Sequence, residues 1–418
     1  MIVYKFGGAS VKNSDSVKNL AEIVKTSQKN LVVVVSAMGK TTNALENVLE
    51  DYFNGNDGFE NKIEGIKNYH LDIARGLFPD NSNAVFDLIN SWFARLNDFC
   101  RKGSSLNFDY EYDQVVSYGE LVSTEIVSAF LNECSLKSKW VDIRTCFKTD
   151  NLFRDATVNM EITGNLVKDS FPDENKIYVT QGFIGSTIEN LSTTLGREGS
   201  DFSAAILANI LEAESLTIWK DVPGILNADP KWFDETVKLN HISYLEAIEL
   251  AYYGATIIHP KTIKPLQNKG IPLFVRSFLD PSETGTVINT VTSEDSRVPS
   301  FIFRMNQVLI SIKPRDFSFI MENALSEIFG KFAGHRVKIN LMQNSAISFS
   351  VSVDNDDRKV PALIKDLQKH YQVLYNDGLE LVTIRHFDQS TIDRVTVGKK
   401  ILVEQKSRST ARFIMKDM

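Results

Sequence analysis

Four residues near the N-terminus have the types and order of a phosphate-binding turn. Lys5 follows the apolar run Ile2-Val3-Tyr4, and Gly7, Gly8 and Ser10 come directly after it. Glycine lacks a Cβ atom, so the backbone can bend sharply there and turn its N–H groups toward an anion, while Lys5 supplies positive charge. A nucleoside triphosphate would lie here. The same residues could also form an ordinary tight turn beside a surface lysine.

A second candidate phosphate loop, Met38-Gly39-Lys40-Thr41-Thr42, fails on its spacing. A P-loop needs a glycine five residues before this one, and Val34 stands there. We interpret the segment as a loop that opens a helix over 43–49. Ser36 and Thr42 would lie at the carboxyl end of a strand, where open α/β sheets bind ligands, so both are expected to line a pocket.

Two further segments combine charge with helix starts. Glu120 stands at the beginning of a helical pattern, where it is either a first-turn acid favoured by the helix dipole or a ligand contact. In 194–201 two glycines bracket Arg197, and Ser200 and Asp201 are expected to cap the next helix. A guanidinium group and a helix N-terminus would then converge on one spot, which suits a carboxylate or a phosphate.

The segment 219–231 is a strand end followed by a long, turn-rich loop. It contains two lysines, Lys220 and Lys231, and the acids Asp221 and Asp229. These side chains could hold a nucleotide and its metal, although the segment could also be a simple connection between a strand and a helix.

The order of elements over the first 280 residues predicts a mostly parallel sheet with helices on both faces. Solid apolar runs alternate with helical patterns, which is typical of α/β proteins. Several amphipathic helices between 43 and 115 are expected to form an added helical layer. Strands are expected at Ile2–Tyr4, Leu31–Val35, Trp140–Ile143, Ile177–Gln181, Ser215–Trp219 and Leu273–Arg276, and helices at Ser16–Thr26, Gly119–Cys134 and Phe202–Leu211.

The pattern changes after a polar, turn-rich stretch. The order β-α-β-β-α-β that follows predicts a ferredoxin-like module. The last forty residues begin with a strand at 381–385 and end in a hairpin, with too little room between them for the usual first helix. The expected boundaries are a first domain over 1–288, a linker over 289–300, a ferredoxin-like domain over 301–378 and a shortened second one over 379–418.

Composition excludes several classes of protein. A net charge of −7 without a basic stripe argues against a nucleic-acid partner. Three cysteines without C-x-x-C spacing indicate neither disulfides nor a zinc site, which fits the cytoplasm. No apolar run approaches a membrane span, and a strand that begins at residue 2 leaves no room for a signal peptide. The six histidines show no metal-ligand spacing, and His259 is interpreted as a structural group at a helix end.

Six motifs in one order resemble those of the aspartate kinases. They are KFGGAS at 5–10, SAMGKTTN at 36–43, SYGE at 117–120, TLGREGSD at 194–201, KDVPGILNADP at 220–230 and GATIIHP at 254–260. The C-terminal portion resembles the paired ACT domains of these enzymes. The resemblance implies the amino-acid kinase fold and ATP-dependent phosphorylation of the L-aspartate side chain, at the head of the pathway to lysine, threonine, methionine and isoleucine. A carboxylate nucleophile is already ionised at neutral pH and needs no general base.

The resemblance also implies roles for particular residues. Lys5 and Asp201 would be catalytic, with Lys5 stabilising the transferred phosphoryl group. Arg197 would hold the aspartate α-carboxylate, and Glu120 and Asp201 its ammonium group or its neighbours, while Ser36, Thr42 and Ser200 complete the pocket. Magnesium would bridge the phosphates, and no protein side chain is assigned to it. The ATP contacts would be Lys5, Phe6, Gly7, Gly8, Ser10, Lys220, Asp221, Leu226 and Lys231.

Three positions depart from the family pattern. Glu198 stands where many members have a small residue. Leu226 replaces an aromatic residue that often contacts the nucleotide in the family, and Thr256 replaces a lysine found in many members.

The resemblance further implies an effector region and a homodimer formed through the C-terminal modules. The effector residues would be Ser318, Met321, Ile339, Asn340 and Ser345. Lysine-inhibited members often have acids at the positions of Asn340 and Ala346, and both are missing. We therefore expect weak inhibition by lysine and a better response to threonine or another neutral effector. The alternatives are another amino-acid kinase and a non-catalytic ACT sensor.

Overall fold

The computed structural model describes the whole chain except residues 28–29, 81, 106, 173–175, 234, 256–257 and 317. The described chain forms two compact units. The N-terminal unit comprises 1–225, 238–248 and 257–292, and the C-terminal unit comprises 226–237, 249–256 and 293–418. The domain boundaries expected from the sequence stay a prediction.

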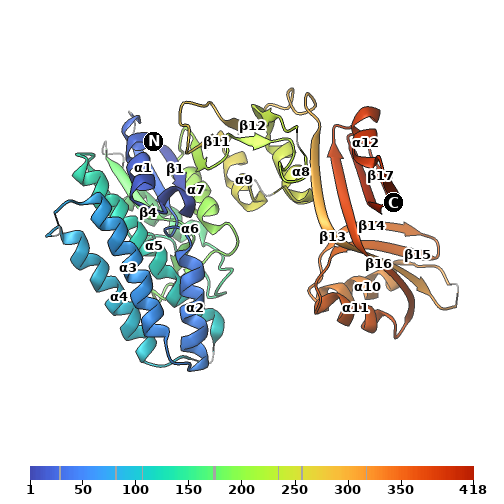
Figure 1. Cartoon of the computed structure of the whole chain (residues 1–418), viewed down its shortest axis with the longest axis horizontal. Coiled ribbons are helices and arrows are strands. Elements are labelled where there is room, and N and C mark those ends of the chain that lie inside the picture. Colours follow the sequence, from blue (N-terminus) through green and yellow to red (C-terminus); the bar gives the residue numbers. More distant parts are fainter. Residues whose placement is uncertain are drawn as a thin grey trace. The chain divides into compact units, whose positions relative to one another are not determined.

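The N-terminal unit is built on a mostly parallel sheet of eight strands, as expected (Figure 1). Their order is β10-β12-β11-β7-β1-β2-β4-β3, and only β11 and β12 pair antiparallel. The strands are β1 (Ile2–Phe6), β2 (Leu31–Val35), β3 (Ser138–Val141), β4 (Ile177–Gln181), β7 (Leu216–Lys220), β10 (His241–Ser243), β11 (Leu273–Ser277) and β12 (Thr286–Asn289).

Helices cover both faces of this sheet because the side chains of each strand alternate between the faces. Tyr4 and Phe6 of β1 pack into the large core formed with helices α1 to α5, whereas Lys5 points to the opposite face, where α7 contacts β1. The helices are η1 (Gly8–Val11), α1 (Ser14–Lys25), α2 (Thr41–Asn54), α3 (Phe59–Leu77), α4 (Ala84–Arg101), α5 (Phe108–Glu133), η2 (Ile143–Thr145), α6 (Met160–Ser170), α7 (Gly199–Ile210), α8 (Tyr244–Tyr253) and α9 (Pro260–Gln267). Four short strands, β5 (Ile184–Ser186), β6 (Ser192–Thr194), β8 (Ile225–Leu226) and β9 (Lys238–Leu239), form two small sheets.

The expected helical layer consists of α2, α3 and α4 together with the first half of α5 (Figure 1). The sequence placed the start of α5 at Gly119, and this was wrong. The helix begins at Phe108, where the Asn107 side chain accepts hydrogen bonds from the backbone N–H groups of Asp109 and Tyr110. Glu120 therefore lies in the middle of a 26-residue helix, and a first-turn dipole effect cannot explain it.

The C-terminal unit contains a single antiparallel sheet of six strands, in the order β14-β15-β13-β16-β18-β17. The predicted β-α-β-β-α-β order is confirmed. The long strands β13 and β16 pair along most of their length and extend through both halves of the sheet, so the two ACT-like modules share their strands (Figure 1). The elements are β13 (Ser300–Pro314), α10 (Glu322–Gly334), β14 (Ile339–Ser345), β15 (Ser348–Asp354), α11 (Lys359–Leu367), β16 (Tyr371–Arg385), α12 (Gln389–Thr396), β17 (Lys399–Lys406) and β18 (Thr410–Asp417).

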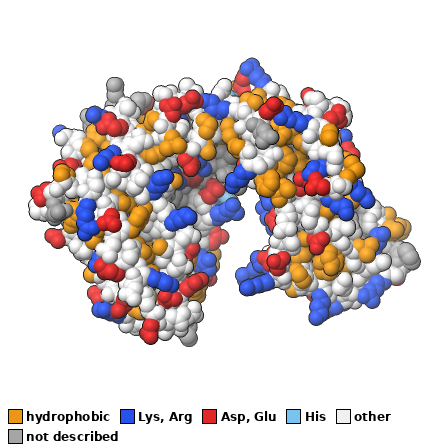
Figure 2. All heavy atoms as spheres, viewed as in Figure 1, with side chains coloured by type: hydrophobic (Ala, Val, Ile, Leu, Met, Phe, Trp, Pro, Cys, Tyr) orange, Lys and Arg blue, Asp and Glu red, His pale blue; other side chains and the backbone are white. Residues whose placement is uncertain are grey.

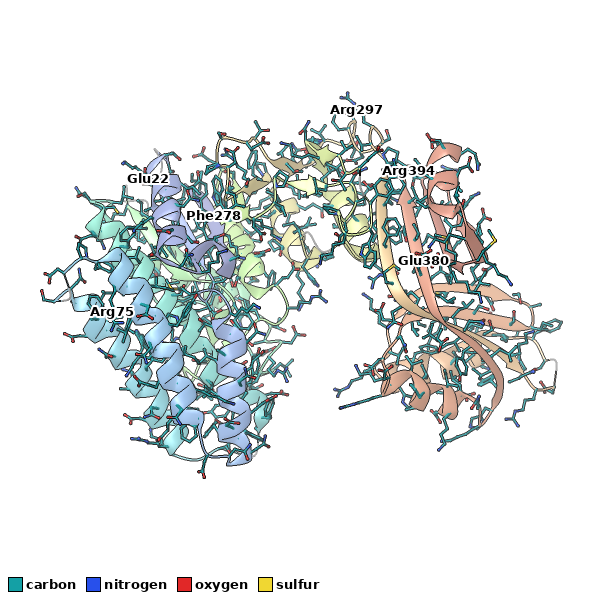
Figure 3. All side chains as sticks on the ribbon, viewed as in Figure 1. Glu22, Arg75, Phe278, Arg297, Glu380 and Arg394 are labelled. Carbon is teal, nitrogen blue, oxygen red and sulfur yellow. The ribbon has the colours of Figure 1, made fainter. Side chains whose placement is uncertain are left out.

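The expectation that the second module lacks a helix between Arg385 and Lys400 was wrong, because α12 lies there. Asp388 caps this helix through a complete capping box, which stabilises a helix of only eight residues. Ile392 and Val395 are buried in the core of this half of the sheet. The guanidinium carbon of Arg394, which is labelled in Figure 3, lies 4.1 Å from the centre of the Phe233 ring.

Charged side chains of both signs are interspersed over the face drawn in Figure 2. Across the described residues, no helix combines the length and the apolar character needed to cross a membrane.

His259 is the N-cap of α9 and accepts a hydrogen bond from the Lys261 backbone N–H at 3.1 Å, which confirms its structural role.

Candidate active site

A pocket of about 600 Å³ lies at the carboxyl ends of β1 and β7, beside α5 and the start of α7. Most of the predicted site residues line it. These are Lys5, Gly7, Gly8, Ser10, Ser36, Thr42, Glu120, Arg197, Ser200, Asp201, Lys220 and Asp221. Their convergence is expected for parallel strands, whose carboxyl ends meet at one edge of the sheet.

The glycine turn after β1 packs directly on the turn after β2. The Gly39 N–H donates to the Gly8 carbonyl oxygen at 3.0 Å. A Cβ atom on Gly8 would lie 2.7 Å from the carbonyl oxygen of Ala37 and 2.8 Å from that of Gly39, so only glycine fits. The segment that looks like a P-loop therefore supports the true phosphate turn.

One end of the pocket contains a buried ion pair with a second cation nearby. Lys5 Nζ lies 2.5 Å from Asp201 Oδ1, and Lys220 Nζ lies 3.8 Å from Asp201 Oδ2. Burial by itself would raise the pKa of Asp201, but the positive charges of Lys5 and Lys220 outweigh it, and the pKa is lowered. The Asp201 charge is therefore fully compensated before any ligand binds, and the two lysines leave one positive charge in excess.

The expected cap of α7 was wrong in detail. Glu198 is the N-cap, with φ of 54°, and makes no side-chain cap hydrogen bond, whereas Ser200 and Asp201 lie in the first turn. The left-handed conformation of Glu198 suits a small residue better than a glutamate. Asp201 still benefits from the helix dipole, which favours an acid in the first turn.

The same pocket contains an acid that forms no ion pair with any described residue. Glu120 is 2 % exposed, and its Oε1 accepts a hydrogen bond from the Ala37 N–H at 3.3 Å. Its Oε2 is buried and has no hydrogen-bond partner. Burial raises the pKa of Glu120 to about 8, against weaker lowering by the Ala37 N–H and the Lys5 charge. Such a carboxylate is suited to receive a cationic group from a ligand.

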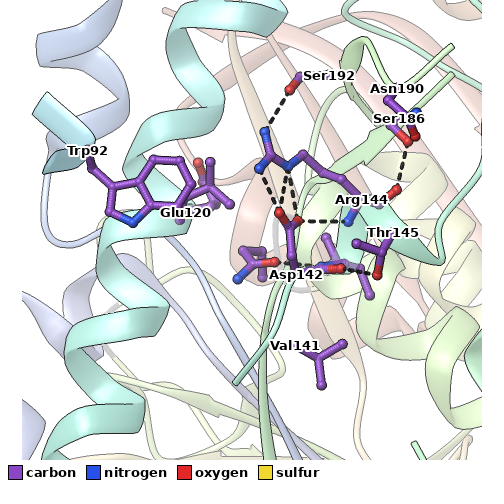
Figure 4. Close-up of polar contacts among 12 residues, drawn as sticks. Trp92, Glu120, Val141, Asp142, Arg144, Thr145, Ser186, Asn190 and Ser192 are labelled. Atoms are coloured by element: carbon purple, nitrogen blue, oxygen red, sulfur yellow. Dashed lines mark hydrogen bonds and ion pairs between the residues drawn. The ribbon is translucent and has the colours of Figure 1, made fainter. Parts of the chain in front are cut away.

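Arg197 lines the same pocket, and no acid pairs with it in the described part of the chain. It follows the short hairpin β5–β6, which α5 and the segment after β3 hold in place. Arg144 forms a fork with Asp142, at 2.6 Å for the closest pair, and donates to Ser192 Oγ at 3.1 Å (Figure 4). The loop that carries Arg197 is thus fixed at its base, while the guanidinium group is free for a ligand.

Sequence reasoning missed several lining residues, including Tyr112, Arg154 and Phe183. Arg154 is the important omission because it adds a second guanidinium group to the pocket. No motif marks it, and only the packing of its turn against α5 brings it there.

Three predicted ATP contacts do not line the pocket. The Phe6 side chain is fully buried and stacks on Trp219, with ring centres 6.1 Å apart. Leu226 and Lys231 belong to the C-terminal unit, and their contact with a nucleotide stays a prediction. Thr256 lies outside the described residues.

The predicted effector residues fall into two places in the chain. The Ile320 N–H donates to the Ala346 carbonyl oxygen at 2.9 Å, which places the segment with Ser318 and Met321 beside the turn that contains Ser345. Asn340 lies near the other end of β14, about 15 to 20 Å away at strand spacing. Its Nδ2 donates to Gln307 Oε1 and Asp354 Oδ1, both at 2.9 Å, within the sheet.

Comparisons with known proteins agree with this geometry. The family model described as the amino acid kinase family matches residues 1–277. Over 411 residues the chain is 31% identical to lysine-sensitive aspartokinase 3 of Escherichia coli, covering 96% of this chain and 90% of that protein. The solved structure of E. coli aspartokinase III with lysine and aspartate has a TM-score of 0.82 at 28% identity, covering 99% of this chain and 95% of that one. The same enzyme with aspartate and ADP gives a TM-score of 0.81 at 28% identity, covering 99% and 96%.

Proposed function

We propose that this pocket performs the phosphorylation of aspartate. The chain belongs to the amino acid kinase family and, within that family, to the aspartokinases. The phosphoryl group would pass from ATP to the side-chain carboxylate, giving 4-phospho-L-aspartate for the synthesis of lysine, threonine, methionine and isoleucine. The observation that carries the proposal is the pairing of unsatisfied charges. An unpaired guanidinium group, Arg197, and a buried carboxylate without a cation, Glu120, line one pocket and match the two charges of an amino acid.

The amino-acid half of the pocket would bind the substrate backbone. Arg197 would hold the α-carboxylate through its planar fork, and the ammonium group would neutralise Glu120. The hydroxyl groups of Ser36, Thr42 and Ser200 would complete the contacts. Glu120 is buried and forms no ion pair within the described part of the chain, so the ammonium group would supply its counter-charge, and this favours an α-amino acid over a simple dicarboxylate.

The phosphate half would stabilise charge that develops during transfer. Lys5 and the backbone N–H groups of Gly7 and Gly8 would stabilise the transferred phosphoryl group, and Lys220 lines the same pocket. The Asp201 carboxylate holds the Lys5 ammonium group in position. The substrate carboxylate is ionised at neutral pH, so the site needs positioning and charge rather than a base, and no histidine is among the described residues that line it.

Magnesium fits this pocket as an ion held by the nucleotide. Among the residues that the structure describes, no cluster of three acids, histidines or cysteines could hold a metal ion. The phosphate oxygens would therefore supply most of its ligands. Asp221, the pocket acid that directly follows Lys220 in the sequence, would be the nearest protein carboxylate. When bound, the ion would neutralise phosphate charge.

Three further features belong to the proposal. The C-terminal unit would form a homodimer and bind an amino-acid effector, as the ACT resemblance implies. Lysine is bound in the solved E. coli structure, and the neutral residues Asn340 and Ala346 would shift the preference of this chain from lysine toward another amino acid. The cysteine composition supports a cytoplasmic location.

A coupled assay of ADP release tests the proposal, with hydroxylamine trapping of the acyl phosphate as a second readout. ADP release should depend on L-aspartate and not on L-glutamate, N-acetylglutamate or succinate. Glu120→Gln should raise the KM for aspartate. Glu125→Gln is the matched control, since this acid lies on the same helix and bonds Trp92 at 3.0 Å without lining the pocket. Equal turnover with glutamate would replace aspartate kinase by another amino-acid kinase.

A further inference from the structure

The pocket contains a second guanidinium group whose position is built into the fold. Arg154 lines the same cavity as Arg197 and comes from the turn between β3 and α6. Its guanidinium carbon lies 4.6 Å from the centre of the Tyr112 ring, and Tyr112 also lines the pocket. Its Nη1 donates to Asp109 Oδ1 at 3.1 Å, and both side chains are about half exposed. An ion pair of this kind is weak, so it orients the guanidinium group without committing it.

The backbone of Arg154 is held in an unfavourable conformation. Its φ is 71°, in the left-handed region that residues with a Cβ atom rarely adopt, at a cost on the order of 1 kcal/mol. The Arg154 N–H donates to Asp113 Oδ2 at 3.0 Å, and this carboxylate is fully buried. A buried acid thus fixes the strained residue that presents the guanidinium group to the pocket.

The same carboxylate also anchors the loop that carries Arg197. Asp113 Oδ2 accepts the Thr194 N–H at 2.8 Å, and Oδ1 accepts the Thr194 hydroxyl at 2.7 Å. The two turns also touch, since a Cβ atom on Gly196 would lie 2.7 Å from Asp155 Oδ1 and 3.2 Å from the Arg154 carbonyl oxygen. Asp113 therefore sets the spacing between the turns that bear the two arginines.

We infer that Arg154 is a second substrate-binding arginine, which shares the non-reacting carboxylate of the amino acid with Arg197, and that Asp113 is the positioning residue for both. The reacting carboxylate must approach Lys5, where Asp201 already balances the charge, so the α-carboxylate is the group left for the arginines. This inference rests on the proposed function of the pocket.

Steady-state kinetics with aspartate and with ATP varied in turn test the inference. Arg154→Ala should raise the KM for aspartate about 10-fold or more, since one charged hydrogen bond is lost, and leave the KM for ATP within about twofold. Arg154→Lys should recover part of the loss. Arg101→Ala is the matched control, because Arg101 pairs with Glu60 at 2.8 Å on the surface and does not line the pocket.

A double-mutant cycle distinguishes a shared carboxylate from separate ones. If both arginines bind one carboxylate, the fold-increase in KM for Arg154→Ala with Arg197→Ala should fall well below the product of the single effects. Asp113→Asn should raise the KM for aspartate while kcat and the KM for ATP change little, which a merely structural role would not produce.

Several results would overturn this inference. An Arg154→Ala enzyme with a KM for aspartate within twofold of the wild type removes Arg154 from the substrate site, and so does an equal rise in both KM values. Multiplicative effects in the cycle would refute the shared carboxylate. If Asp113→Asn does not fold, the Arg154 variants decide alone. A wild-type protein without aspartate-dependent ADP release would overturn the proposed function itself, and the inference about Arg154 and Asp113 with it.

Discussion

The pocket contains two carboxyl groups shielded from solvent, and their pKa values are shifted in opposite directions. Asp201 has two lysines within 4 Å, and its pKa is lowered. Glu120 has one backbone N–H, and burial raises its pKa to about 8. Burial is similar, so the difference lies in the partners. The fold gives Asp201 two ion-pair partners and gives Glu120 none among the described residues, which leaves the ion-pair partner of Glu120 to the substrate.

Removing the charge of Lys5 should have the largest effect on activity. Lys5→Met removes the charge that faces the transferred phosphoryl group, so kcat should fall about 100- to 1000-fold. The variant should be less stable, because Asp201 then stays buried with only Lys220 nearby, but thermal unfolding should still show a folded protein. Lys18→Met, at an exposed position on α1, is the control. A Lys5→Met enzyme with half of the wild-type turnover would contradict the assignment.

Removing the guanidinium group of Arg197 should weaken the binding of aspartate. Arg197→Ala should raise the KM for aspartate about 10- to 100-fold and leave that for ATP nearly unchanged, because the lost partner binds a carboxylate. Arg197→Lys should recover only part, since the bidentate fork is lost. If the dependence on ATP collapsed and that on aspartate held, Arg197 would belong to the phosphate end.

The contrast in pKa predicts a pH dependence that one substitution should remove. Because the pKa of Glu120 is about 8 in the free protein, the group is mostly protonated at pH 7 and must lose its proton to receive the ammonium group. Below pH 8 the affinity for aspartate should rise by up to about tenfold per pH unit, and above pH 8 it should level off. Glu120→Gln should show a flat profile between pH 6 and 8. A flat wild-type profile would mean that Glu120 does not receive the ammonium group.

The smallest effect is expected in the C-terminal unit. An ammonium group needs an acidic partner there too, and this requirement applies to lysine as an effector. Lysine carries two ammonium groups, and the neutral residues Asn340 and Ala346, which lie in the two separate places described above, stand where lysine-inhibited members often have acids. The nearby Asp354 carboxylate already accepts from Asn340 and lies 3.6 Å from Arg304 Nη1. Lysine alone should therefore inhibit weakly at millimolar concentration, and threonine more strongly. Half-maximal inhibition by submillimolar lysine, lost on Ser345→Ala, would show that other groups replace the acids.

The amino-acid sequence by itself determined most of the chemistry. The strand, lysine and two glycines at the N-terminus predicted the phosphate turn, because glycine is required wherever two backbones approach as closely as Gly8 and Gly39 do. Apolar runs predicted the parallel strands, and the carboxyl ends of parallel strands necessarily meet. These signals were enough to expect Lys5 and Ser36 at one edge of the sheet, whereas Glu120, Arg197 and Asp201 were assigned to the same site through the resemblance to the aspartate kinases.

Only the tertiary structure decided which of these charges are paired. The spacing of Lys5 and Asp201 along the chain contains no sign of their contact, which arises because α7 packs on the face to which Lys5 points. Local signals also misplaced the start of α5 and missed α12, since capping side chains and burial against the sheet set those limits. Arg154 and Asp113 carry no motif. Their roles come from one buried carboxylate that joins turns 41 and 81 residues away, and contacts over such separations are decided by packing.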